Sequence, residues 1–263
     1  MSALLEVRKL GKRFAQRQGR EPSPWVIQDL SFSVREGELL TIVGPSGAGK
    51  STLLNIIAQI DTASAGEIIF DGADVTTRDP RTLKPGLDRR IGYVTQDDNL
   101  LPWRNTLENV MFGLHVQGRL DDATRARAET LIRAVGLAGF ERYYPHELSG
   151  GMRKRTALIR TLVYDPPVIL MDEPFGALDA QTRTQLQEDL LRLWHLGRKT
   201  IVFVTHDIAE AIALADRTLV LTRAPAHVAG EHAITIPRPR DIRGIMTHPD
   251  FAALYQRIRA QVQ

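Results

Sequence analysis

The stretch Gly44–Thr52 reads GPSGAGKST and matches the pattern G-x-x-x-x-G-K-[ST] of a phosphate-binding loop. The apolar run 38–44 before it is typical of a buried strand, and the run after it is typical of a helix. Glycines let backbone amides converge on phosphate oxygens, and the following helix adds the positive end of its dipole. We therefore expect a bound nucleotide, with Lys50 reaching its β- and γ-phosphates and Ser51 supplying a hydroxyl to Mg²⁺. The residues of this phosphate loop are Gly44, Pro45, Ser46, Gly47, Ala48, Gly49, Lys50, Ser51 and Thr52.

Acidic residues and a histidine end two further apolar runs. VILMD (168–172) ends in Asp172, whose carboxylate suits Mg²⁺ or its water, and Glu173 is placed to polarise an attacking water. Such a carboxylate pair can also be an ordinary helix cap, an alternative that the phosphate loop weakens. TIVFVTHD (200–207) places His206 at a strand end, where parallel sheets bind ligands. His206 is therefore either a structural residue or a hydrogen-bonding partner of the γ-phosphate.

The order of these patterns indicates an α/β fold. The apolar runs lack polar alternation, which is typical of a parallel sheet covered on both faces. A helical pattern over about 180–196 between two of them gives a βαβ arrangement. Residues 105–147 show helical patterns only, including a helix capped by Asp121, so we expect a helical lobe inserted in the core. The segments VRKLGKRF and WVIQDLSFSV before the phosphate loop look like antiparallel strands.

The composition excludes several classes of protein. A net charge of +3 over 263 residues does not argue for a nucleic-acid partner. The absence of cysteine excludes a disulfide framework and a thiolate metal site. No apolar run approaches the roughly 20 residues that span a bilayer, and MSALLEVRKL is not a signal peptide. If the protein works at a membrane, we expect another chain to span it.

Together these residues resemble the nucleotide-binding subunit of ABC transporters, over nearly the whole chain and in the expected order. The phosphate loop is similar to that family's Walker A loop, and VILMDEP (168–174) is similar to its Walker B strand. His206 is similar to its switch histidine. Gln96, otherwise an ordinary solvated loop residue, is similar to the glutamine of that family's Q-loop. The segment 96–99 is called the Q-loop here. LSGGM (148–152) is similar to the family's signature sequence, here called the signature loop, and ALD (177–179) is similar to its D-loop.

The resemblance implies a role for each of these residues. Lys50, Glu173 and His206 would be catalytic. Besides the phosphate loop, the nucleotide ligands implied are Phe14, Gln96, Ser149, Gly150, Gly151 and Asp179. The Mg²⁺ ligands implied are Ser51, Gln96 and Asp172. Phe14 aligns with the aromatic residue that stacks on adenine, although Trp25 is a competing candidate. Arg153, Lys154 and Arg155 are either a solvated helix face or phosphate contacts.

The resemblance also implies the fold and its division. It implies a P-loop NTPase core, RecA-like, with an antiparallel β subdomain and an inserted helical subdomain over about 97–160. We expect one ABC ATPase domain over 1–235 and a short tail with a helix over 236–263. Met152, the segment LLPWRNTLENV and the tail motif IPRPRD resemble the nitrate, sulfonate and taurine importer branch.

The implied function is ATP binding and hydrolysis in a homodimer that drives uptake of a small solute. The signature loop would contact ATP bound to the opposite subunit. The implied partners are a separate membrane permease and, through it, a periplasmic or extracellular solute-binding protein, with the homodimer at the cytoplasmic face of the inner membrane. Leu100, Leu101 and Trp103 offer an apolar surface for the permease, although Trp103 could equally fill the lobe's own core.

Two other functions remain open, an ABC exporter and a soluble ABC ATPase outside transport. The chromosome-maintenance type of soluble ATPase needs long heptad arms between its nucleotide motifs, and the helical lobe here is far too short. The translation-factor type carries two cassettes in one chain, whereas this chain carries one.

Overall fold

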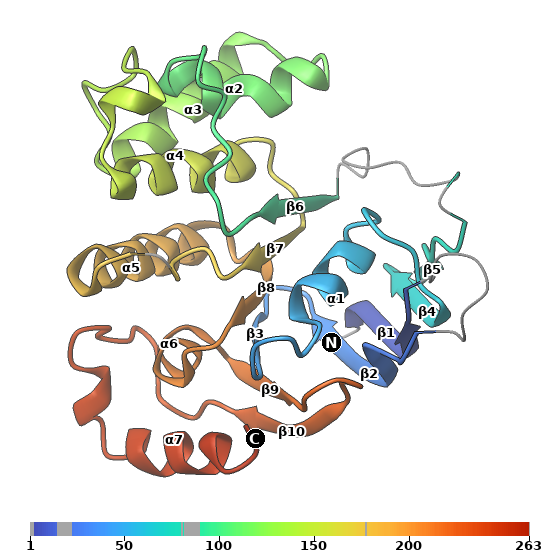
Figure 1. Ribbon diagram of the computed structural model, residues 1–263. Coiled ribbons are helices and arrows are strands. Elements are labelled where there is room, and N and C mark those ends of the chain that lie inside the picture. The colour runs from blue at the N-terminus through green and yellow to red at the C-terminus, as the bar shows by residue number, and fades with distance from the viewer. Residues whose placement is uncertain (1–2, 15–22, 80, 82–89, 177, 263) are drawn as a thin grey trace. The chain divides into compact units, whose positions relative to one another are not determined.

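The computed structural model describes residues 3–14, 23–79, 81, 90–176 and 178–262 (Figure 1). The chain folds into two compact units, one formed by Met1–Arg89 with Lys199–Gln263 and the other by Arg90–Arg198. Within the described ranges, no helix combines the length and the apolar character that crossing a membrane requires. The phosphate loop belongs to the first unit, and the signature loop belongs to the second.

The first unit contains a mostly parallel sheet of β3 (Leu39–Val43), β8 (Thr200–Thr205), β9 (Arg217–Leu221) and β10 (Val228–Ala233). Their order is β10-β9-β3-β8; β3 is parallel to β8 and β9, and β10 is antiparallel to β9. Strands β3, β8 and β9 are buried along their whole length, as expected for a sheet covered on both faces. Helix α1 (Lys50–Ile57) follows β3, and α6 (Ile208–Leu214) follows β8.

The two segments before the phosphate loop pair as antiparallel strands, as predicted, within a four-stranded sheet. Its strands are β1 (Ala3–Lys12), β2 (Ile27–Arg35), β4 (Ala65–Phe70) and β5 (Ala73–Asp74), in the order β2-β1-β4-β5. Strand β2 alternates between buried and exposed residues along most of its length, so one face of it packs and the other meets solvent.

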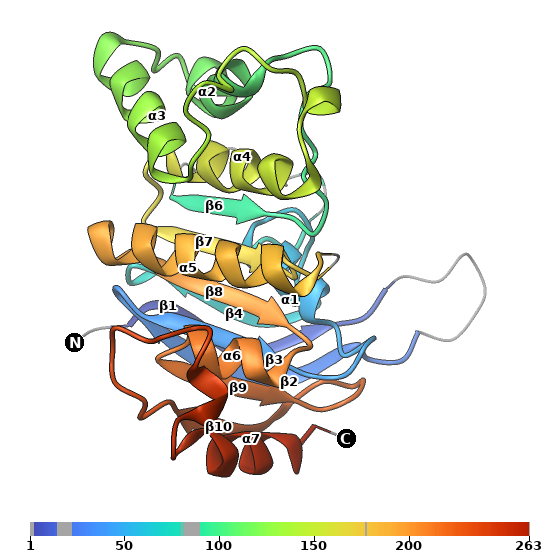
Figure 2. The same ribbon diagram turned by 90° about the vertical axis from the view of Figure 1, so that its left-hand side faces the viewer.

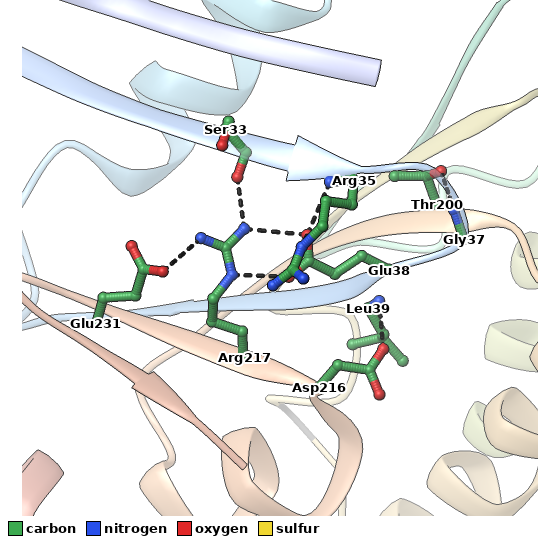
Figure 3. A network of polar contacts seen from close by, with 9 residues as sticks. All are labelled: Ser33, Arg35, Gly37, Glu38, Leu39, Thr200, Asp216, Arg217 and Glu231. Carbon is green, nitrogen blue, oxygen red and sulfur yellow. Dashed lines mark hydrogen bonds and ion pairs between the residues drawn. The ribbon is translucent and has the colours of Figure 1, made fainter. Parts of the chain in front are cut away.

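A buried ion pair connects the two sheets of this unit (Figure 3). The Arg217 guanidinium donates from Nε to Glu38 Oε1 at 2.7 Å and from Nη2 to Glu38 Oε2 at 3.0 Å. The same guanidinium donates to Glu231 Oε1 on β10 at 2.7 Å and to the Ser33 carbonyl on β2 at 2.5 Å. The side chains of Arg217 and Glu38 are 9% and 5% exposed, so each charge depends on the other.

Replacing Arg217 with methionine is expected to lower the free energy of unfolding by about 3–5 kcal/mol, because the buried Glu38 carboxylate then loses its bidentate partner. Urea unfolding followed by circular dichroism measures the loss. Glu231→Gln is the matched control; this side chain is 51% exposed, and its ion pair is expected to contribute less than about 1 kcal/mol. Equal losses in the two variants would contradict a dominant role for the buried pair.

The tail motif IPRPRD holds the C-terminal end of α6. Arg240 Nη1 donates to the carbonyls of Ile212 at 3.1 Å and Ala215 at 2.5 Å, and Arg238 Nη2 donates to the Leu214 carbonyl at 2.5 Å. The last carbonyls of a helix lack intrahelical partners, and cations there interact favourably with its dipole. Burial lowers the pKa of Arg240 to about 10, so the guanidinium stays charged at neutral pH. The tail ends in η3 (Ile245–Thr247) and α7 (Phe251–Arg259), and α7 packs against α6 and β10 (Figure 2).

The second unit combines two parallel strands with helices. Strand β6 (Ile91–Val94) pairs with β7 (Val168–Asp172). The helices are α2 (Thr106–Val116), α3 (Asp122–Ala134), α4 (Gly150–Leu162) and α5 (Ala180–Gly197), with the short η2 (Pro145–Glu147) before α4. Helix α2 packs against α3 and α4, and α4 contacts β6 and α5. As predicted, Asp121 caps α3, its Oδ1 accepting from the Thr124 amide at 2.7 Å.

Candidate functional site

The phosphate loop lies between β3 and α1, as its sequence pattern predicts. Gly47 and Gly49 have φ angles of +79° and +78°, which favour glycine over every other residue. A Cβ at Gly49 would lie 2.9 Å from Val26 Cγ1, so the loop also needs glycine there for space. The buried Lys50 ammonium donates to the carbonyls of Gly44 at 2.9 Å and Pro45 at 3.1 Å. These two hydrogen bonds keep the ammonium group of Lys50 against the backbone of the phosphate loop.

His206 emerges beside the phosphate loop at the same edge of the sheet. Val43 and Thr205 are partners in the parallel pair of β3 and β8, so Gly44 and His206 are the next residues along the two strands. The His206 side chain is exposed, whereas Thr205 before it is buried. Asp207 then caps α6, its Oδ1 accepting from the Ala209 amide at 2.8 Å. This end of the sheet therefore presents an imidazole and a phosphate loop to the same side.

Asp172 ends β7 in the second unit, and Glu173 follows it directly. Burial and the Asp172 carboxylate together raise the pKa of the Tyr93 hydroxyl above its usual range, so this hydroxyl stays protonated and hydrogen-bonds to Asp172. Glu173 has a φ of +43°, a left-handed conformation that is rare for a residue with a side chain and typical of functional sites. Its carbonyl accepts from the Gly176 amide at 3.1 Å, which closes a tight turn after the strand.

Gln96 lies near this carboxylate pair. It follows β6, and Val94 on that strand is the partner of Met171 on β7, so Gln96 and Asp172 belong to the same end of the parallel pair. The Gln96 side chain is exposed. Tyr93 is not predictable from the sequence as a site residue, because its only signal is its place on a strand that pairs with the Asp172 strand.

The signature loop forms the start of α4. Ser149 is the exposed N-cap, and its Oγ accepts from the Met152 amide at 3.3 Å. A Cβ at Gly151 would lie only 2.8 Å from Thr182 Cγ2 at the start of α5. Gly151 therefore allows the first turns of two helices to approach within one subunit. Asp179 has a similar local role, since its Oδ1 accepts from the Thr182 amide at 3.0 Å and caps α5.

Gly151→Ala is expected to lower kcat for ATP hydrolysis by about tenfold or more, because the added methyl group displaces α4 relative to α5. Thr182→Ser removes the clashing Cγ2 atom and keeps a hydroxyl. The double variant should therefore recover most of the activity if the defect arises from packing within the subunit. Steady-state ATPase assays of the four proteins measure this. A double variant no better than Gly151→Ala would instead point to contact between Gly151 and nucleotide.

The basic run after the signature loop binds groups of its own subunit. Arg153 pairs with Asp98 at 3.1 Å, Arg155 pairs with Asp189 at 3.0 Å, and Lys154 donates to the Gln96 carbonyl. These side chains are part-buried and bind acidic or carbonyl groups of their own subunit. A solvated face is thus wrong for this run, and a phosphate contact stays a prediction. Local spacing carries no signal for these partners, which lie 34 to 58 residues away.

The two candidate adenine-stacking residues have different surroundings. Phe14 is 48% exposed, and Lys12 Nζ lies 5.0 Å from its ring centroid. Trp25 packs closer to the sheet, because a Cβ at Gly11 would lie 3.0 Å from its Cζ3 atom. The Arg13 guanidinium covers the Trp25 ring at 5.0 Å. Phe14 thus keeps the more accessible ring, and its role remains a prediction, as does that of the D-loop, whose Ala177 lies outside the described residues.

The apolar surface expected around residues 100–103 is smaller than predicted. Leu100 is 9% exposed and belongs to the core of the lobe, so it does not contribute to the surface. Trp103 is 70% exposed, so its expected alternative role in that core is wrong. A mainly apolar groove of about 150 Å³ lies next along the chain, on one side of α2. This α2 groove is lined by Arg104, Leu107, Glu108, Met111, His115, Leu120 and Arg125.

Known proteins resemble the chain along most of its length. A model of the ABC transporter family matches residues 27–176. An uncharacterised ABC transporter ATP-binding protein of Methanocaldococcus jannaschii, MJ0412, is 44% identical over 92% of this chain and 86% of its own. The taurine import ATP-binding protein TauB of Burkholderia pseudomallei is 41% identical over 92% and 90%, and the aliphatic sulfonates import ATP-binding protein SsuB of Bacillus cereus is 39% identical over 90% and 89%. The dimeric structure of the ATP-binding cassette MJ0796 bound to ADP and Pi aligns with a TM-score of 0.75 and 33% identity, over 88% of this chain and 98% of that one.

Proposed function

Since this chain belongs to the ABC transporter family, it is an ATP-binding and ATP-hydrolysing subunit of an importer, and we propose how its residues perform that work. The observation that carries the proposal is the presence, in one chain, of the phosphate loop on β3 and an exposed signature loop at the start of α4. A phosphate loop alone suits many nucleotide-binding proteins. The exposed amides and hydroxyl at the start of α4 suit a second phosphate contact.

ATP is held mainly by the phosphate loop. The glycine-rich backbone surrounds the phosphates, and the Lys50 ammonium exchanges its two loop carbonyls for phosphate oxygens. Phe14 stacks on the adenine ring. Ser51, Gln96 and Asp172 offer a hydroxyl, an amide and a carboxylate oxygen, the kinds of ligand that Mg²⁺ prefers, and the ion supplies charge neutralisation of the phosphates. Tyr93 supports this role because its hydroxyl holds the Asp172 carboxylate.

Hydrolysis is assigned to Glu173 and His206. The Glu173 carboxylate accepts a proton from the attacking water as the water oxygen bonds to the γ-phosphorus and the bond from that phosphorus to the β-phosphate oxygen breaks, which releases ADP. The left-handed backbone at Glu173 supports this role, because it fixes the direction in which the side chain leaves the strand. His206 hydrogen-bonds to the γ-phosphate and to the water from the end of β8. Its exposure next to the buried Thr205 supports a role toward a ligand.

The working form is a homodimer in which each signature loop completes the partner's site. Ser149, Gly150 and Gly151 offer a hydroxyl, amides and the positive end of α4 to the γ-phosphate of ATP on the partner subunit. Two ATP molecules then join two subunits, and hydrolysis lets them separate. The dimeric structure of MJ0796 with ADP and Pi supports this arrangement.

The permease is proposed to dock on Trp103 and the α2 groove. An exposed tryptophan next to an apolar groove is typical of a protein interface, where such residues contribute most of the binding energy. Arg104 and Arg125 at the groove favour an apolar helix that also carries acidic residues. The occupant we assign is a cytoplasmic helix of the membrane permease, which places this subunit at the cytoplasmic face of the membrane.

Trp103→Ser is expected to weaken binding to the co-expressed permease by about 30-fold, the loss typical of an interface hot spot. Co-purification with the tagged permease measures it. The melting temperature should change little, because the side chain is 70% exposed. Met246→Ser is the matched control, since Met246 is 67% exposed and lies in the tail. Equal retention of the two variants on the permease would contradict docking at Trp103.

The transported solute is proposed to be of the nitrate, sulfonate or taurine type. The taurine and aliphatic sulfonate import relatives support this class. The test is to reconstitute this subunit with its permease and the solute-binding protein in vesicles. We expect ATP-dependent uptake of a solute of this class, which should also raise the melting temperature of the solute-binding protein. ATPase activity stimulated by nucleic acid, with no uptake, would contradict the proposal.

A further inference from the structure

Three basic side chains of α4 reach back to the Q-loop within the second unit. Arg160 Nη1 donates to the Asn99 carbonyl at 2.7 Å, and its Nη2 donates to the Asp98 carbonyl at 2.8 Å. Lys154 Nζ donates to the carbonyl of Gln96 itself. Arg153 Nε donates to the Asp98 carboxylate at 3.1 Å. The Q-loop is therefore bound by side chains of α4, the helix whose first residues belong to the signature loop.

Arg153 differs from the other two because it contacts both loops. Its Nη1 donates to the Leu148 carbonyl at 2.7 Å, directly before Ser149, while its Nε binds Asp98, two residues after Gln96. A guanidinium is planar and rigid, so two groups bound to it keep a fixed separation. The pair is partly shielded from solvent, with side chains 36% and 28% exposed. Movement of one loop without the other would break at least one of these bonds.

We propose that Arg153 is a positioning residue that makes the Q-loop and the signature loop move as one piece. This inference rests on the proposed function, in which Gln96 contacts the subunit's own nucleotide and Ser149 contacts the partner's. A change at one nucleotide then reaches the other site through Asp98, Arg153 and Leu148. Arg153 thus supplies coupling between the two ATP sites of the dimer, in addition to any contribution to stability.

The test compares Arg153→Gln and Asp98→Asn in a Glu173→Gln background that retains ATP. The Leu100 amide donates to Asp98 Oδ1 at 3.3 Å, and Asp98→Asn keeps an oxygen that can accept this bond. Both changes should leave the affinity of the monomer for ATP within about twofold. Both should weaken ATP-dependent dimerisation, measured by analytical ultracentrifugation, by about tenfold or more. The double variant should dimerise no more weakly than Arg153→Gln alone, because Arg153→Gln already removes the bond to Asp98.

A second measurement separates coupling from simple stability. With Glu173 intact, Arg153→Gln should lower the Hill coefficient for ATP hydrolysis toward 1 relative to the unmodified protein. Arg127→Gln is the matched control, because the Arg127–Asp165 pair at 2.6 Å lies in the same unit, is 43% and 45% exposed and touches neither loop. The control should leave both dimerisation and the Hill coefficient unchanged.

Failure of this inference is distinguishable from failure of the proposed function. If the Glu173→Gln parent does not dimerise with ATP, the shared site itself is wrong. If the parent dimerises and Arg153→Gln and Asp98→Asn do so equally well, with an unchanged Hill coefficient, the coupling role of Arg153 is overturned. Additive effects of the two changes would also overturn it, because they would show that Arg153 and Asp98 act separately.

Discussion

Replacing Glu173 with glutamine is expected to lower kcat for ATP hydrolysis by about 10²–10⁴-fold, the usual contribution of a general base. Glutamine has the same size and keeps one oxygen, but it does not accept a proton from water at neutral pH. ATP binding should persist, because the contacts assigned to the phosphates come mainly from the phosphate loop. ATP that is bound and not hydrolysed should hold two subunits together, so the variant should run as a dimer in millimolar ATP and Mg²⁺.

Release of phosphate and size-exclusion chromatography measure these two results. Glu36→Gln is the control, because Glu36 is an exposed glutamate in the turn before β3 and should leave the hydrolysis rate unchanged. A Glu173→Gln variant that hydrolyses ATP at more than about a tenth of the original rate would remove Glu173 from its role as the base. A variant that binds ATP and stays monomeric would contradict the shared site.

Lys50→Met is expected to weaken ATP binding by about 100-fold. The methionine keeps most of the buried stem but removes an ammonium whose bonds to charged groups each contribute about 1.5–3 kcal/mol. Isothermal titration calorimetry with ATP and Mg²⁺ measures the affinity. The two variants should therefore differ, since Lys50→Met should lose ATP binding and Glu173→Gln should lose hydrolysis.

Lys50 also holds its own loop, and a second measurement separates this role from nucleotide binding. Loss of the bonds to the Gly44 and Pro45 carbonyls should lower the melting temperature of the nucleotide-free protein by a few degrees. ATP should raise the melting temperature of the original protein and leave that of Lys50→Met nearly unchanged. A Lys50→Met variant that binds ATP within threefold of the original would contradict the assigned contact.

The parts that could be predicted from the sequence are those set by local pattern. Glycine spacing predicts the turn between β3 and α1, because few other residues adopt its positive φ angles. Apolar runs without alternation predict β3, β7 and β8, because strands covered on both faces need no polar residues. Asp121 predicts the start of α3, since an N-cap side chain acts on its own helix.

The parts that could not be predicted depend on which distant residues meet. Leu100 and Trp103 belong to one short segment and have similar apolar character, yet one is buried and the other is 70% exposed. Asp98 and Gln96, which bind Arg153 and Lys154, lie more than 50 residues earlier, so local spacing holds no signal for these contacts. The tail motif IPRPRD likewise gave no hint that its arginines would bind the end of α6.

The left-handed backbone at Glu173 sets stability against activity at that one position. A residue with a side chain is less stable in this conformation by on the order of 1 kcal/mol, whereas glycine is not. Selection for heat resistance alone would therefore favour Glu173→Gly, which relaxes the backbone and removes the carboxylate together. Engineering of a more heat-resistant subunit should leave residue 173 untouched and seek its gains elsewhere.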